Sequence, residues 1–458
     1  MAPSVRSALS TTLSIPVFPP ELCRNILDDL CDDRRSLSAC SLTCWAWAPW
    51  ARRHLFENVI LTDIDHCLSF VAILKSSVAA GTSIQDYVRT VKFSSDGYTR
   101  PEWRDAARWA FRHLPNIDSL QLTSCNYNEL VAWVSEASYD EQVDINATFI
   151  GSLFSSFWIS SLSISMVSFR TWADFWTLCT CFPSLTRLVL MNMQIDQPLD
   201  LENPTLDIKA NDTASMPALT TITSLVVASG IIDTAIVLRG LSRYPFELHL
   251  RQVDCFYAGG DDPRMFDAIM SSKQSLEYLH LMIWNDSFLR QADLTKHTSL
   301  QTLLLGFSYG CFDVGSKPYT ALPTFLARLH LGRLRDLTFY IRLPVPLVER
   351  MSWEFFDWPD LDRSLAVLAK KKPALRVTFD LTSSKSDGDT IPDIVGPLVD
   401  RLRNSLVAGM MIKAVVRGGP LTHPLDDSGL SCWLPIPHDA VESLRAVHAL
   451  QRTGQLGI

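Results

Sequence analysis

The chain has 458 residues, a formal net charge of −8 at pH 7, and hydrophobic and charged fractions of 47% and 20%. This composition is that of an ordinary globular protein with ample apolar material for an extended core. A mildly acidic chain lacks the clustered Lys and Arg of a nucleic-acid interface, so we expect no nucleic-acid partner. The basic run at residues 370–372 is short and is expected to be a solvated helix end.

Cysteine usage and hydropathy predict a protein of a reducing compartment with no membrane span. The eleven cysteines include no CxxC pair, which favours free thiols and a cytoplasmic or nuclear location. Residues 1–15 lack the apolar centre of a signal peptide and are expected to be a disordered leader. The uncharged stretch 146–169 is long enough for a membrane helix, but Leu162 to Met166 alternate as in a strand.

Three short helices are predicted between residues 18 and 56. A proline pair opens the first helix, because a missing N–H costs nothing in the first turn. The apolar residues at helical spacing are Leu22, Ile26, Leu27 and Leu30 in the first helix, and Leu37, Cys40, Cys44 and Trp47 in a second that begins near Ser36. Pro49 starts the third. Helices this short cannot bury their apolar faces alone, so they are expected to need a partner surface.

This segment resembles the F-box. The opening Leu-Pro-x-Glu-Leu pattern of that family is matched by Phe18, Pro19, Glu21 and Leu22, the central apolar residues by Ile26, Leu27 and Leu30, and the closing Val-Cys-x-x-Trp pattern by Thr43, Cys44 and Trp47. The sequence departs from the pattern in Phe18, in Thr43, and in Trp45, where a basic residue is common. The match covers under a tenth of the chain.

The resemblance implies docking on a Skp adaptor, which joins F-box proteins to a cullin. The residues that would contact the adaptor or pack beneath the contact are Pro19, Leu22, Ile26, Leu27, Leu30, Leu37, Cys40, Cys44 and Trp47. Cys40, Cys44 and His54 could suggest a metal site, but a fourth ligand is missing nearby, and helix packing is the preferred interpretation. We expect no metal and no cofactor.

A short phrase recurs along the rest of the chain: apolar, two variable residues, apolar, variable, apolar. Its clearest copies span residues 184–190, 275–281 and 299–305, and looser copies begin at Tyr87, Asn116, Trp158, Thr221, Pro245, Arg333 and Pro373. This is the strand phrase of a leucine-rich repeat, in which alternate residues of a parallel strand point inward. The intervals are irregular, and most copies lack the usual turn asparagine. Helices are expected between strands, at residues 103–113, 263–272, 319–331 and 361–370.

The expected fold is therefore α/β, with a helical F-box followed by an irregular leucine-rich-repeat-like solenoid. The predicted domains are a leader at 1–15, an F-box at 16–60, a solenoid at 61–437 and a helical cap at 438–458, whose helix spans 439–451. The expected function is substrate recruitment for an SCF-type cullin-RING ubiquitin ligase, with an unknown protein substrate held by the repeats. Such an adaptor catalyses no reaction itself.

Two other functions stay open. One is a leucine-rich-repeat scaffold that joins no ligase. The other is a serine hydrolase, because residues 306–310 match G-x-S-x-G around Ser308, and Asp360, Asp380 and His423 follow in the usual order. Gly315, Lys317 and Pro318 interrupt the helix that such a nucleophile needs. The acidic turn at residues 259–262 and the Asp427-Ser428-Gly429 sequence are interpreted as ordinary turns.

Overall fold

The computed structural model describes most of the chain between residues 19 and 433. The described residues are 19–94, 106, 109–125, 158–196, 220–228, 234–241, 246–258, 269, 271–272, 274–283, 286–308, 319–343, 356–383, 398–418 and 430–433. The predicted leader, the predicted C-terminal helix, the acidic turn at 259–262 and the sequence at 427–429 lie outside them.

One open sheet of thirteen strands runs through almost the whole described chain. All neighbouring strands are parallel, except the last pair. In spatial order they are β1 (Asn58–Leu61), β2 (Thr90–Ser94), β3 (Ser119–Thr123), β4 (Ser161–Ser165), β6 (Arg187–Met191), β8 (Thr220–Ala228), β9 (Phe246–Ala258), β10 (Tyr278–Ile283), β11 (Thr302–Ser308), β12 (Asp336–Leu343), β13 (Arg376–Ser383), β14 (Met411–Gly418) and β15 (Leu430–Trp433). The chain is thus an α/β protein, as expected.

A repeated backbone contact sets the register between neighbouring strands. The carbonyl of Arg89 accepts N–H groups from both Asp118 and Ser119, and the carbonyl of Asp118 does the same for Ser160 and Ser161. The same double contact recurs one strand further along, where the carbonyl of Ser160 accepts two N–H groups at the start of β6. Each strand therefore begins beside the start of its predecessor, which keeps the apolar residues of all strands on one face.

The turns after β3, β4 and β6 also repeat. The residue that follows each strand has a left-handed backbone, with φ of 50° at Ser124, 52° at Met166 and 48° at Asn192. Only Asn192 is of a type that favours this conformation. After the turns, β5 (Ser168–Phe169) and β7 (Gln194–Ile195) form a small second sheet. The rarity of asparagine in these turns agrees with the irregular sequence copies.

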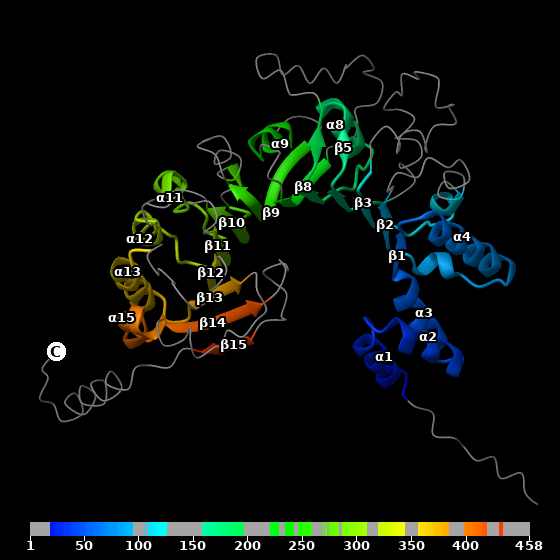
Figure 1. Cartoon of the computed structure of the whole chain (residues 1–458), viewed down its shortest axis with the longest axis horizontal. Helices are drawn as coiled ribbons and strands as arrows, with labels where there is room; N and C mark the ends of the chain where they lie inside the picture. The colour runs from blue at the N-terminus through cyan, green and yellow to red at the C-terminus, as the bar shows by residue number, and fades with distance from the viewer. Residues whose placement is uncertain are drawn as a thin grey trace, which may run out of the picture.

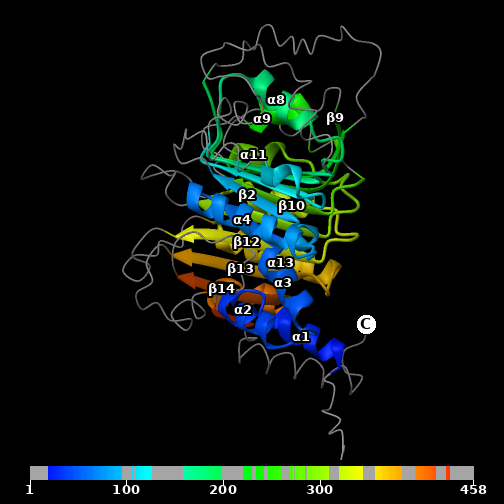
Figure 2. The same ribbon diagram turned by 90° about the vertical axis from the view of Figure 1, so that its right-hand side faces the viewer.

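Helices cover the outer face of the curved sheet, and the strands line the inside of the arch (Figures 1 and 2). The covering helices are α4 (Ile64–Ala79), η1 (Ile84–Tyr87), α8 (Trp172–Thr180), α9 (Thr234–Leu241), α11 (Asp286–Gln291), α12 (Leu322–Ala327), α13 (Trp358–Lys371) and α15 (Arg403–Val407). Alternate strand residues, such as Leu120 and Leu122 in β3, point to these helices and are buried in one continuous apolar cluster. The sheet and its helices therefore share one core.

The N-terminal part of the chain forms a separate helical head at one end of the arch (Figure 1). The head consists of α1 (Pro20–Asp29), α2 (Arg34–Thr43) and α3 (Ala48–Glu57). Helix α3 ends at Glu57 and β1 begins at Asn58, so no linker separates the head from the sheet. The first strand therefore starts within the segment 16–60.

Each of the ten predicted strand phrases overlaps a strand of the sheet, whereas the helices are predicted less well. Helix α13 agrees with the expected helix at 361–370, but α12 covers only the middle of the expected 319–331. The expected helices at 103–113 and 263–272 lie only partly within the described residues. The sequence interpretation missed β1, β14, β15 and α4, and α4 has sixteen residues.

Candidate docking surface

The head is built from three ten-residue helices with clear starts. Prolines occupy the first turns of α1 and α3, where their missing N–H groups are tolerated. Asp33 caps α2 by accepting hydrogen bonds from the N–H groups of Arg35 and Ser36, each at 3.1 Å. The Ser36 hydroxyl also donates to Asp33 at 2.6 Å, and these bonds lower the pKa of the Asp33 carboxyl. The pKa direction follows because the bonds favour the ionised form.

A small core holds the head together. Leu27 of α1, Leu37 of α2 and Ala51 of α3 are fully buried against one another. At the edge of this core, Nε2 of His54 lies 2.8 Å from Oδ1 of Asp28, which joins α3 to α1. Three fully buried side chains make a very small core. The head therefore depends on its surroundings for stability.

The predicted adaptor-binding residues fall into three groups. Pro19, Leu22, Ile26 and Cys44 are exposed; Leu27 and Leu37 are buried in the core of the head; Leu30, Cys40 and Trp47 are half-buried against that core. Leu22 and Ile26 are 48% and 37% exposed, which is high for large aliphatic side chains. Only the exposed residues, together with the exposed edges of the half-buried ones, are placed to contact a partner directly.

Two further exposed residues of the head were not among the predicted contacts. Leu42, near the end of α2, is 83% exposed, and Trp45, just after that helix, is 85% exposed. Trp45 had stood out in the sequence only as a departure from the usual basic residue. Leu42 lies off the apolar stripe of α2, and that offset is the sequence signal for an outward-facing side chain. We call Leu22, Ile26, Leu42 and Trp45 the head patch.

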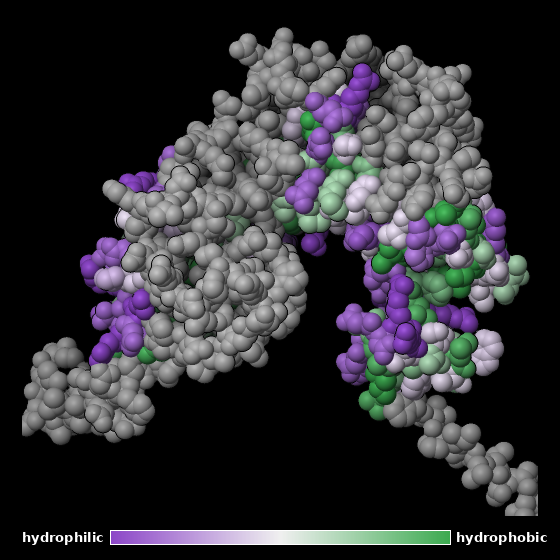
Figure 3. Space-filling view, in the orientation of Figure 1, coloured by the Kyte–Doolittle hydropathy of each residue, from purple (hydrophilic) through white to green (hydrophobic). Residues whose placement is uncertain are grey.

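Exposed apolar side chains are concentrated near the head. In the described residues, twelve large hydrophobic side chains are exposed, and eight of them lie between Leu22 and Val78. The other four are scattered: Trp158, Met166, Val367 and Met411. Single exposed apolar residues are normal on any protein, whereas contiguous apolar patches are typical of interaction surfaces. Figure 3 shows apolar side chains over both the head and α4.

The inner, strand-lined face of the arch is open over β2 to β6. One row across these strands contains Lys92, Gln121, Ser163 and Val189, which lie side by side in register and are partly exposed. Their neighbours on β3 and β4 are mostly Ser and Thr. This part of the face offers the hydroxyl groups of Ser and Thr and the amide group of Gln121 to solvent.

Further along the sheet, the side chains of the same row are buried. It continues through Asp254, His280 and Leu304, each at most 2% exposed. Nδ1 of His280 lies 2.7 Å from Oδ1 of Asp254, so this part of the row contains a buried contact between an imidazole and a carboxyl group. Burial, and then the neighbouring Asp254 carboxylate, raise the pKa of the Tyr278 hydroxyl. The row is partly exposed again at Thr338, Thr378 and Lys413, so the strand face is accessible on both sides of this buried part.

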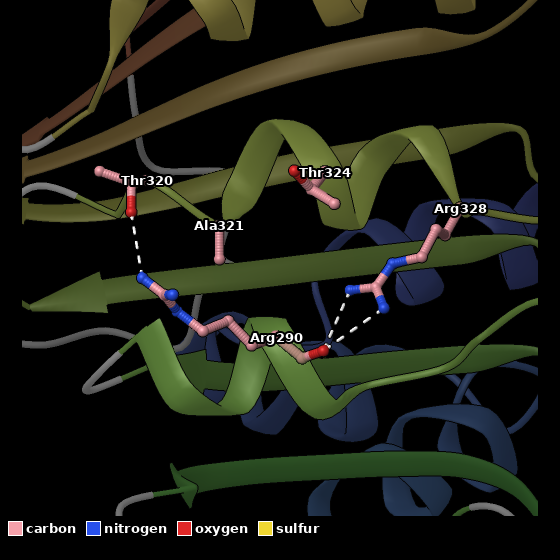
Figure 4. A pocket seen from close by; sticks show the side chains of 5 residues that line it. All are labelled: Arg290, Thr320, Ala321, Thr324 and Arg328. Carbon is pink, nitrogen blue, oxygen red and sulfur yellow. Dashed lines mark hydrogen bonds between the residues drawn. The ribbon is translucent and has the colours of Figure 1, made fainter.

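A cavity of about 260 Å³ lies on the outer surface between α11 and α12 (Figure 4). Its lining residues are Arg290, Thr320, Ala321, Thr324 and Arg328. Arg290 pairs with Asp286 at 3.0 Å, and Arg328 donates to the carbonyls of Leu289 and Arg290 at the end of α11. Both guanidinium groups are therefore bound within the protein itself, and their bonds join the neighbouring helices around this cavity.

Ser308, the nucleophile of the hydrolase alternative, is the last residue of β11 and pairs in register with Arg342 of β12. Asp360 lies on the outer helix α13 and forms an ion pair with Arg363 at 2.7 Å. Asp380 is buried in β13, and His423 lies outside the described residues. The three described candidates for a catalytic triad therefore sit on different elements, and only Ser308 and Asp380 are in the sheet.

No protein-family model and no curated protein match this chain. Among the described residues, no group of three or more His, Cys, Asp or Glu side chains could hold a metal ion. None of the described helices is both long enough and apolar enough to cross a membrane.

Proposed function

We propose that this protein is an F-box-type substrate-recruiting subunit of a cullin-RING ubiquitin ligase. In this function the head binds a Skp adaptor, and the curved sheet, as an irregular leucine-rich-repeat solenoid, holds a protein substrate. The observation that carries the proposal is the head patch: Leu22, Ile26, Leu42 and Trp45 are exposed on a domain with only three fully buried side chains. A domain of this kind gains stability when a partner covers it.

The exposed residues of the head agree with the sequence resemblance in one further respect. Pro19, Leu22 and Ile26 belong to the matched F-box pattern and point outward, while Leu27 and Leu37 from the same pattern form the internal core. The pattern therefore separates into a packing set and a contact set. Such a division favours a docking module over a helical cap that packs on the rest of the protein.

In this function the protein positions a substrate and catalyses no reaction itself. A substrate bound on the open strand face of β2 to β6 would be held next to the head, which raises the effective concentration of its lysines near the ligase. No catalytic group of this chain is needed. A repeat scaffold outside any ligase remains the alternative, because the open strand face suits either function.

A pull-down of the whole chain by purified Skp adaptor tests the proposal. The informative variant carries Leu22→Asp with Trp45→Asp, which replaces exposed side chains and leaves the core of the head intact. The control is Val367→Asp, since Val367 is equally exposed, at 48%, on the distant helix α13. We expect the wild type and the control to bind and the head variant to lose binding. A wild-type chain that the adaptor does not retain would overturn the proposal and leave the scaffold.

A further inference from the structure

Basic side chains gather where the connection from α12 to β12 meets the end of α13. Residues 331–336 and 370–376 together carry six basic residues and one acidic residue, Asp336. The six, which we call the basic corner, are Arg333, Arg335, Lys370, Lys371, Lys372 and Arg376. All of them except Lys372 are exposed. Since the whole chain has a net charge of −8, the basic corner is opposite in sign to the molecule as a whole.

Hydrogen bonds hold the two segments of the basic corner together. The Lys372 ammonium group donates to the carbonyls of Leu331 and Gly332, at 2.5 and 2.7 Å. The N–H of Arg376 donates to the carbonyl of Arg335 at 2.8 Å. Burial, and then the neighbouring Arg335 guanidinium, lower the pKa of the Lys372 ammonium group. Like charges from segments far apart in the sequence are therefore close together here.

Little negative charge balances the basic corner. Asp336 pairs with Arg376, with one carboxylate oxygen 2.7 Å from Nε and the other 2.9 Å from an Nη nitrogen. This two-point contact occupies both oxygens of the carboxylate. Within the described part of the chain, Arg333 and Arg335 form no ion pair. Neighbouring cations without counterions repel one another, and an anionic partner would relieve that repulsion.

The basic corner adjoins the inner, strand-lined face of the sheet. Asp336 and Arg376 are the first residues of β12 and β13. Because alternate residues of a strand face the same side, Thr338 and Thr378 share the face of this ion pair. Lys413 of β14 lies beside Thr378 and is also partly exposed. A polypeptide that contacts the basic corner could therefore continue over hydroxyl groups and one further cation.

We propose that the basic corner binds a short acidic segment of a partner protein, one rich in Asp and Glu. The carboxylates of such a segment can meet the guanidinium and ammonium groups while its remaining residues follow the strand face. A nucleic acid, as an extended polyanion, would also lie over the acidic remainder of the chain and be repelled there. Single exposed ion pairs are weak, so several carboxylates are needed together. The inference goes beyond the proposed function and holds for a ligase subunit and for a scaffold alike.

Fluorescence anisotropy of a fluorescein-labelled oligoglutamate peptide, titrated with the whole chain at about 50 mM salt, tests the inference. We expect the variant Arg333→Gln with Arg335→Gln to weaken binding about fivefold to thirtyfold. The matched control is Arg112→Gln with Arg170→Gln, which removes the same charge from two exposed arginines on other elements. The control should stay within about twofold of wild type.

A second variant, Lys370→Gln with Lys371→Gln, leaves both arginines in place and should weaken binding in the same direction. Thermal melts verify that each variant is folded. Wild-type affinity in the arginine variant would overturn the inference. An equal loss in the control would also overturn it, because binding would then follow net charge alone. A thymidine oligonucleotide that binds more tightly than the peptide, and is lost in the arginine variant, would identify a nucleic-acid partner instead. None of these variants alters the head, so Skp binding tests the proposed function separately.

Discussion

At the scale of single residues, two carboxylates join neighbouring outer helices. Asp362 of α13 is buried and accepts hydrogen bonds from the N–H groups of Asn404 and Ser405 at the start of α15, at 2.9 and 2.7 Å. Asp286 of α11 similarly accepts the N–H of Ala321, which precedes α12. Because the first N–H groups of a helix have no partner within it, each carboxylate completes the start of the next helix.

Replacing Asp362 should therefore be costly. We expect Asp362→Asn to lower the free energy of unfolding by about 1–3 kcal/mol, since one acceptor oxygen becomes a donor facing buried N–H groups. The Asp360→Asn variant on the same helix is the matched control, and its exposed pair with Arg363 is worth under about 1 kcal/mol. Urea denaturation compares the two. Equal effects would show that Asp362 does not complete the start of α15.

A glycine in α9 allows that helix to approach an aromatic cluster. A Cβ atom at Gly240 would lie 1.9 Å from Cζ2 of Trp176, a buried side chain packed between Phe175 and Phe246. Gly→Ala within a helix usually stabilises by about 1 kcal/mol. Here the clash with a rigid indole ring makes the expected effect of Gly→Ala on stability destabilising.

We expect Gly240→Ala to destabilise the protein by about 1–3 kcal/mol. Trp176→Leu, which removes the obstructing ring, should also destabilise, but the double variant should be more stable than the sum of the single effects predicts. Thermal or urea unfolding of the four proteins gives the coupling. Additive effects would contradict the close approach of Gly240 and Trp176.

At the scale of elements, the head and the sheet differ in how they are stabilised. The sheet and its outer helices share one long apolar cluster, whereas the head has only Leu27, Leu37 and Ala51 fully buried. Isolated helices of ten residues are marginal in water, and most helical stability comes from packing. The head should therefore be the least stable part of the described chain.

We expect a peptide of residues 19–57 to show little helix and no cooperative thermal transition by circular dichroism. Adding purified Skp adaptor should raise its helix content, because burial of the head patch offsets the entropy of ordering. A peptide that melts cooperatively on its own would show that three buried side chains suffice. One that stays disordered with a saturating excess of adaptor would argue against the proposed docking.

The sheet was largely predictable from the sequence, and the docking surface only in part. The recurring phrase predicts strands because burial on one face requires alternate apolar residues. Helix α4 was missed because Leu68, Ile73 and Val78 add apolar residues to its outer side and obscure the period of an amphipathic helix. The offset of Leu42 from the apolar stripe of α2 was a local signal of its exposure, whereas the exposure of Trp45 depends on how the three helices pack, which no local pattern records.

At the scale of the whole molecule, reactive and unreactive thiols separate by position. Cys44 is exposed on the head, whereas Cys67 and Cys181 are buried in the main core. Burial raises the pKa of both core thiols to about 12. Only about one in ten thousand of these buried thiols is ionised at pH 8, and the thiolate is the reactive form.

We expect iodoacetamide at pH 8 to modify Cys44 in the native protein and to leave Cys67 and Cys181 unmodified until unfolding. Bound Skp adaptor should slow the reaction at Cys44, because the proposed interface covers the head. Peptide mass spectrometry follows each site separately. Undiminished modification of Cys44 in an adaptor-saturated sample would place the interface elsewhere.

The direct passage from α3 at Glu57 to β1 at Asn58 has a mechanical consequence. No residues lie between them to act as a flexible linker, and the N–H of Arg89 also donates to the carbonyl of Glu57, so a rotation of α3 would shift the start of β1. The direct connection therefore restricts changes in the distance between the head and the open strand face. In the proposed function, this distance would limit which lysines of a bound substrate come within reach of the ligase.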